Sequence, residues 1–137
     1  MTYNLYIAEL LVRVFAGVLF LFQGYDKLFR IKLPGVINAF KDDAQRYHVP
    51  HAFVTGLAWY TSLAEFIGGI FLLAGFMTNY ALYALGIDLV LVAIAFSYMD
   101  AMWDMKHVFP RLLLVVILLL LSQNCRHYSL DGFLKLD

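Results

Sequence analysis

Long apolar stretches separated by short polar ones dominate this chain and predict helices that cross a membrane. Four such stretches follow one another, at about residues 5–24, 53–77, 81–99 and 108–122. Twenty helical residues at about 1.5 Å each match a hydrocarbon core of about 30 Å. The fourth stretch is short, so it needs little tilt, a thinner bilayer or the preceding turn to span one. Because only Thr78-Asn79 separates the second and third stretches, these two form an antiparallel hairpin.

The sizeable polar segment between the first two stretches predicts a short amphipathic helix at about residues 34–47. Val36, Phe40 and Ala44 recur in it at helical spacing, opposite charged and polar side chains. Such a helix lies on the membrane surface, with its apolar side against lipid or against the bundle. We therefore predict an all-α integral membrane protein with a single domain over residues 1–137. It is a four-transmembrane-helix up-down bundle with this surface helix between helices 1 and 2.

Composition supports a membrane protein and excludes several other classes. Hydrophobic residues make up 63% of the chain and charged residues 15%, whereas soluble domains are about half apolar and a quarter charged. The formal net charge is zero, so no overall field favours nucleic acid as a partner. The single cysteine, Cys125, leaves no pair for an internal disulfide or for dithiol chemistry. The lipid bilayer is therefore the expected partner.

Five ionisable residues lie inside the apolar stretches: Glu9, Arg13, Glu65, Asp88 and Arg111. An ionisable group near the bilayer centre costs at least about 2.5 kcal/mol unless it is paired or faces water. Arg111 lies near a helix end and can extend to the headgroups, so it is the least informative. The other four form a candidate buried polar site, and a salt-bridge network that fixes helix register is the competing interpretation.

Pairings within this candidate site follow from spacing and from the neighbouring small residues. Glu9 and Arg13 are four residues apart on one helix, which is the spacing of an ion pair. Glu65 shares a stripe of small and polar residues with Gly68 and Gly69, which lets a neighbouring backbone approach. We expect Arg13 and Glu65 to meet inside the bundle.

The same patterns predict the directions of one residue on the second stretch and one on the third. Leu72 is expected to face lipid, away from the Glu65 stripe. Asp88 shares a face with Ala81, Ala84 and Ala95, which predicts an inward, closely packed surface.

The segment "LFQGYDKLFR", residues 21–30, gathers polar residues at the end of the first stretch. Gly24 allows a close approach or a helix end, and Tyr25 suits the headgroup level. Asp26 and Lys27 can pair at the interface. A helix stop with interfacial anchors explains most of the segment, and Lys27 is its functional candidate.

Metal binding is not expected. His48 and His51 flank Val49-Pro50, but no cysteine lies nearby and no third ligand is evident. A turn with surface histidines is the simpler interpretation.

Several motifs in order resemble the DoxX family of small four-helix bacterial membrane proteins. They are Arg13, the run Gly24-Tyr-Asp-Lys-Leu28, Val49-Pro50, the run from Ala64-Glu65 to Thr78, and Ala81, within residues 13–95. The family name derives from a subunit of a thiosulfate:quinone oxidoreductase. The resemblance implies a multi-pass protein of the bacterial inner membrane.

Three functions remain open for this chain. One is an anchoring or quinone-interacting subunit of a membrane oxidoreductase assembly, with other membrane subunits as partners and no covalently bound cofactor. A diffusing quinone is then the candidate ligand, and Tyr25, Trp59 and Tyr60 are its candidate binding residues. The second is a small homo-oligomeric carrier coupled to protons or anions, and the third is a structural assembly factor without catalytic activity.

Overall fold

The computed structural model describes residues 2–98, 105–122 and 130–134, and all of its regular elements are helices. In chain order they are α1 (Thr2–Tyr25), the π-helix η1 (Asp26–Arg30), α2 (Lys32–Arg46), α3 (His51–Ala74), α4 (Thr78–Tyr98), α5 (Met105–Ser122) and α6 (Leu130–Leu134). Residue 99, the predicted end of the third apolar stretch, lies outside the described residues. The all-α class is confirmed.

Three helical stretches are long and apolar enough to cross a membrane: Tyr3–Arg30, His51–Ala74 and Thr78–Tyr98. They contain 28, 24 and 21 residues, which at 1.5 Å per residue exceed about 30 Å. The apolar part of α5, Val108–Leu121, is shorter. The protein is therefore a membrane protein with three candidate spans in the described chain.

Helices α1 and α3 pack closely because glycines remove side chains from their contact. A Cβ atom built on Gly24 would lie 2.6 Å from Cα of Phe66, and one built on Gly69 would lie 2.7 Å from Cα of Leu21. In each of these two contacts the residue numbers add up to 90. A constant sum is expected of two antiparallel helices, because the numbers rise along one helix as they fall along the other. The close approach predicted at Gly69 is confirmed.

The core includes Leu72, together with residues of α1, α4 and α5 such as Phe20, Leu82 and Leu118. Leu72 is 0% exposed, so the prediction that it faces lipid is wrong. Helix α3 packs against α1 and α4, and Leu72 lies between these neighbours instead of on the outer face.

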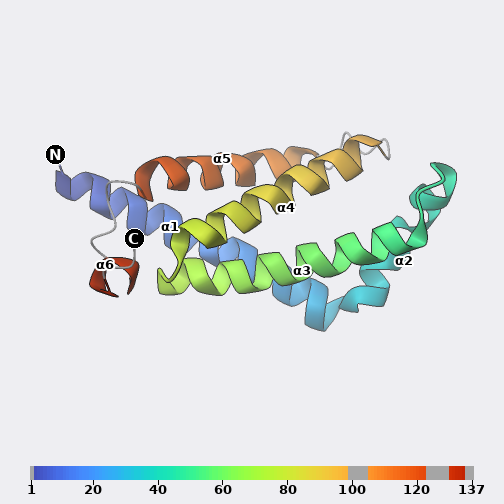
Figure 1. Ribbon diagram of the computed structural model, residues 1–137, viewed down its shortest axis with the longest axis horizontal. Helices are drawn as coiled ribbons and strands as arrows, with labels where there is room; N and C mark the ends of the chain where they lie inside the picture. Colours follow the sequence, from blue (N-terminus) through green and yellow to red (C-terminus); the bar gives the residue numbers. More distant parts are fainter. Residues whose placement is uncertain (1, 99–104, 123–129, 135–137) are drawn as a thin grey trace.

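The turn between α3 and α4 is held by the C-terminal helix α6. Gly75 has a left-handed backbone (φ 64°) and ends α3 before the predicted limit at Met77. The buried carboxylate of Asp131 accepts hydrogen bonds from the backbone N–H groups of Met77 (2.6 Å) and Thr78 (2.7 Å). Asp131 thereby caps the start of α4. Figure 1 shows α6 beside this turn, at the end of the molecule where the N-terminus lies.

Helix α2 lies at the opposite end of the molecule, next to the start of α3 (Figure 1). It begins at Lys32, before the predicted start at Pro34, and Lys32 itself has a positive φ of 60°. Val36 and Ala44 are buried, and α2 contacts α3 and η1. The apolar face of this amphipathic helix therefore rests on the bundle.

Candidate functional site

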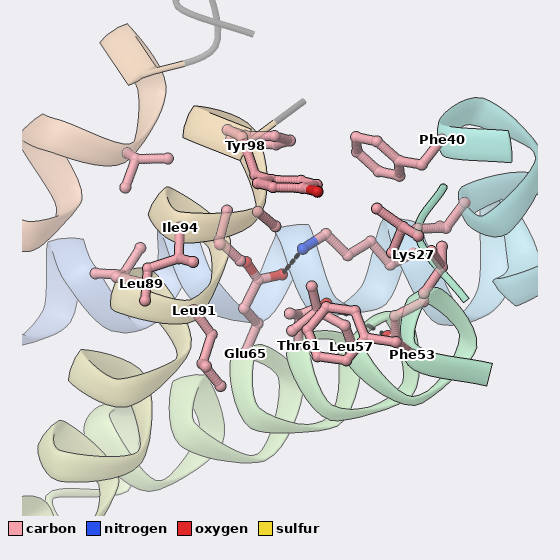
Figure 2. A pocket seen from close by; sticks show the side chains of 18 of the residues that line it. Lys27, Phe40, Phe53, Leu57, Thr61, Glu65, Leu89, Leu91, Ile94 and Tyr98 are labelled. Carbon is pink, nitrogen blue, oxygen red and sulfur yellow. Dashed lines mark hydrogen bonds and ion pairs between the residues drawn. The ribbon is translucent and has the colours of Figure 1, made fainter. Parts of the chain in front are cut away.

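A cavity of about 640 Å³ lies at the end of the bundle where α2 meets the first half of α3 and the second half of α4. This volume is within the range of about 300–1,000 Å³ typical of small-molecule sites. Figure 2 shows side chains converging on it from these helices. Its mostly apolar lining includes Phe40, Phe53, Leu57, Leu89, Ile94 and Tyr98.

An ion pair between Lys27 and Glu65 forms part of the cavity wall. Lys27 Nζ lies 2.7 Å from Glu65 Oε2, and the side chains are 26% and 2% exposed, respectively. In Figure 2 the Lys27 side chain extends across the cavity toward Glu65. A buried carboxylate is stabilised by such a partner, and an ammonium group has three donors, more than the one that faces Glu65.

The backbone geometry at the end of α1 brings these two residues together. Gly24 lies against the backbone of Phe66, the residue that follows Glu65. The chain then continues as the π-helix, in which the N–H of Ile31 donates to the carbonyl of Asp26 at 2.8 Å. Lys27 lies in this π turn, a geometry often found at functional sites.

The predicted pair between Arg13 and Glu65 is not formed, because the two residues lie at different levels of the bundle. In the register of α1 against α3, Glu65 is level with Tyr25 and not with Arg13. Twelve residues along a helix separate these levels by about 18 Å. Each charge has a nearer partner, namely Glu9 for Arg13 and Lys27 for Glu65.

Glu9 and Arg13 form a buried pair at the other end of α3. Arg13 Nε lies 2.9 Å from Glu9 Oε1, as their spacing predicts. The guanidinium also donates to the carbonyl of Leu72 at 3.0 Å, in the last turn of α3. A cation at this point satisfies a terminal carbonyl and opposes the negative end of the helix dipole. The pair stabilises the packing of α1 on α3, and neither residue lines the cavity described above.

The predicted interfacial pair between Asp26 and Lys27 is replaced by two other pairs. Arg30 NH1 lies 3.2 Å from Asp26 Oδ1 on the exposed surface, whereas Lys27 turns inward to Glu65. Adjacent helical residues point in different directions, and residues four apart share a face.

Asp88 is completely buried in α4, at 0% exposure. Neither of its carboxylate oxygens has a hydrogen-bond partner among the described residues. It lies on the same helical face as Val92 and Ala95, which line the cavity. The inward position predicted for Asp88 is therefore observed, and no described residue bonds to its carboxylate.

The aromatic residues predicted to bind a quinone lie on exposed surface. Tyr25, Trp59 and Tyr60 are 44%, 49% and 38% exposed. The Tyr25 ring packs on Phe29 with centroids 5.0 Å apart, and the Tyr60 hydroxyl donates to the carbonyl of Ala84 at 3.3 Å. Aromatic residues of other segments, such as those labelled in Figure 2, line the cavity instead.

Arg111 also lines the cavity, although its expected place near a helix end made it the least informative of the five ionisable residues. Helix α5 begins at Met105, so Arg111 lies six residues, or about 9 Å, inside the helix rather than at its end. The apolar run placed the predicted start at residue 108, where Pro110 falls in the first helical turn, as is common for proline. Pro110 therefore gave no signal that α5 starts at Met105.

These features define a class of protein: a helical membrane protein with ionisable groups buried between apolar helices, beside an apolar cavity. The DoxX family model matches residues 8–99, about two thirds of the chain. The chain belongs to the DoxX family. Comparisons with curated proteins and with solved structures gave no match. The matched region contains Lys27, Glu65 and Asp88, whereas Arg111 lies beyond it.

Proposed function

We propose that this protein is a quinone-binding integral subunit of a membrane oxidoreductase assembly in the bacterial inner membrane. The observation that carries the proposal is the apolar cavity with the Lys27–Glu65 pair in its wall. A quinone combines an apolar ring and tail with carbonyl oxygens that accept hydrogen bonds. Sites for such ligands are mostly apolar and contain a few placed polar groups.

The roles of the polar groups follow from their donors and acceptors. Lys27 has three N–H donors, so one remains available to a quinone carbonyl while another faces Glu65. Glu65 is an acceptor for the hydroxyl of the reduced quinol. Thr61 also lines the cavity, but its hydroxyl already donates to the carbonyl of Ala58 at 3.3 Å. Electrons are supplied and removed by partner subunits in this proposal.

The proposal includes a fourth span, formed by α5. Eighteen helical residues reach about 27 Å, close to the thickness of the hydrocarbon core. Helix α5 packs against both α1 and α4, so it shares the membrane level of two candidate spans. The bundle is then up-down, with both chain ends on one membrane face.

The test is to fill the cavity and measure the quinone that remains bound. Ala95 lines the cavity, whereas Ile87 lies on the same helix and is 57% exposed. We expect quinone in organic extracts of the purified wild-type protein and of Ile87→Phe. Ala95→Phe is expected to lose it, because the added ring occupies the cavity. Equal quinone content in the two variants would show that the cavity is not the binding site.

A second variant tests the headgroup contact. Lys27→Met removes the donor, and a hydrogen bond to a charged group contributes about 1.5 kcal/mol or more. We therefore expect affinity for a short-chain benzoquinone to fall about tenfold or more. Exposed Lys41→Met is the control. Unchanged affinity in Lys27→Met would remove Lys27 from the site.

The alternative is an oligomeric carrier, favoured by two ionisable groups at the cavity: Arg111 in its lining, and Asp88 behind it, whose oxygens receive no hydrogen bond from a described residue. Purification in mild detergent separates the two functions. Copurifying redox subunits and bound quinone support the first, and a homo-oligomer that conducts protons or anions in liposomes supports the second.

A further inference from the structure

Asp88 has an environment that opposes a negative charge. It is 0% exposed, and neither oxygen receives a hydrogen bond from a described residue. An ionised carboxylate without donors in a low-dielectric interior is far costlier than a neutral carboxylic acid. Its burial and the lack of a donor among the described residues therefore both favour the protonated form.

Among the described residues, three elements place titratable groups near Asp88: Glu65 and Tyr60 of α3, Lys27 of η1 and Arg111 of α5. Glu65 carries the same charge and disfavours a second carboxylate nearby. Lys27 is already paired with Glu65, and the Tyr60 hydroxyl donates to Ala84. No ion pair or hydrogen bond links Arg111 to Asp88 in the described part of the chain. The neutral acid is thus the less costly state.

The position of Asp88 connects it to the cavity. It precedes Leu89, lies one helical turn from Val92, and both of these residues line the cavity. Glu65 forms part of the cavity wall and interacts electrostatically with Asp88. A proton on the Asp88 carboxyl group would therefore lie next to the residues that line the cavity.

We propose that Asp88 is a proton-exchange residue: it holds a proton in the resting protein and exchanges it with the contents of the cavity. Donation breaks the O–H bond of the acid and forms an O–H bond on an acceptor oxygen, either of water or of a ligand. The remaining carboxylate then has Arg111 as its nearby opposite charge. No electron moves in this step. Only the identity of a quinone as acceptor rests on the proposed function.

Infrared spectroscopy of the purified, quinone-free protein tests the protonation state directly. A protonated carboxylic acid has a carbonyl band separate from the carboxylate bands. We expect this band in the wild-type protein, a shift of the band in D₂O, and loss of the band in Asp88→Asn. Asp42→Asn, at an exposed position of α2, should retain it. Absence of the band from the wild type, or its persistence in Asp88→Asn, would overturn the proposal.

Two further measurements test the assignment of the band to an aspartate and the exchange of its proton through the cavity. If Asp88→Asn does not fold, isotopic labelling of aspartate carboxyl carbons in the wild type replaces it: the band must move, and a band that does not move contradicts the assignment. Exchange into D₂O should be slower in Ala95→Phe than in Ile87→Phe, since the first fills the cavity. Equal rates would overturn exchange through the cavity.

The outcomes distinguish this inference from the proposed function. An Asp88 band in a protein that binds no quinone leaves the proton-exchange residue in place and removes the quinone. Bound quinone in a protein without an Asp88 band would support the proposed function and contradict the role of Asp88 as a proton-exchange residue.

Discussion

The contact between α1 and α3 makes a graded prediction for alanine substitutions at three glycines of α3. At Gly69 the new Cβ atom would lie 2.7 Å from Cα of Leu21, about 1 Å inside the optimal separation of carbon atoms. At Gly68 its nearest neighbour is the side chain of Leu85, at 2.9 Å. At Gly56 no atom lies within 4 Å. An added methyl group would therefore displace backbone at Gly69 and a side chain at Gly68, and would displace nothing at Gly56.

The expected energies follow from these contacts. Alanine stabilises a helix interior by about 0.5–1 kcal/mol relative to glycine, so Gly56→Ala should be neutral or stabilising by this amount. Overpacking costs about 1–3 kcal/mol, and Gly69→Ala should be near the upper end because a backbone cannot rotate aside. The gain of replacing glycine applies at both positions and cancels, so Gly69→Ala should be less stable than Gly56→Ala by about 2–3 kcal/mol. Gly68→Ala should be intermediate.

The assay is equilibrium unfolding in mixed micelles, followed by circular dichroism, with the free energy of unfolding compared across the three variants. Gly24→Ala extends the test to α1, because its new Cβ would lie 2.6 Å from Cα of Phe66. If Gly69→Ala and Gly56→Ala had the same stability, the close approach of the two backbones would be refuted.

Three further predictions concern the ion pair, the cap and the sidedness of the chain. Lys27→Met and Glu65→Gln should each destabilise the fold by up to about 3 kcal/mol, because each leaves a charge without its partner. The double variant should be destabilised by less than the sum of the two, and additive losses in a double-mutant cycle would contradict the ion pair. Asp131→Ala should lower the free energy of unfolding by about 2 kcal/mol and Asp131→Asn by less, because the amide keeps one acceptor oxygen; equal stability of Asp131→Ala and wild type would exclude the cap. Cysteines replacing the exposed Tyr3 and Phe133 in a Cys125→Ser background should react from one membrane face, and labelling from opposite faces would rule out four spans.

The helices could be predicted from the sequence because their signals are local. Apolar length identified the three candidate spans, and the spacing of Val36, Phe40 and Ala44 identified α2. The spacing of four residues also indicated the pair of Glu9 with Arg13, since it lies within one helix.

The candidate site was harder to predict because it depends on how the helices are placed against each other. The sequence shows that Arg13 and Glu65 lie on neighbouring helices with small residues beside them, which suggests a pair. The contacts of Gly24 and Gly69 set the register of α1 against α3, and in this register the two charges lie at different levels of the bundle. Lys27 was identified as a candidate residue, but its inward direction depends on the π turn. A hydrophobicity pattern contains neither kind of information.

The bonds from Asp131 to the start of α4 have a consequence for the order of events during synthesis. The N–H of Thr78 receives its side-chain partner from a residue made 53 positions later, about 3–10 s at 5–20 residues per second. During that interval the α3–α4 turn is complete in sequence but lacks its cap, and α5 has still to be made. A ribosome stalled before residue 131 would therefore hold an α3–α4 hairpin that frays at its turn, and release of the last residues would fix it.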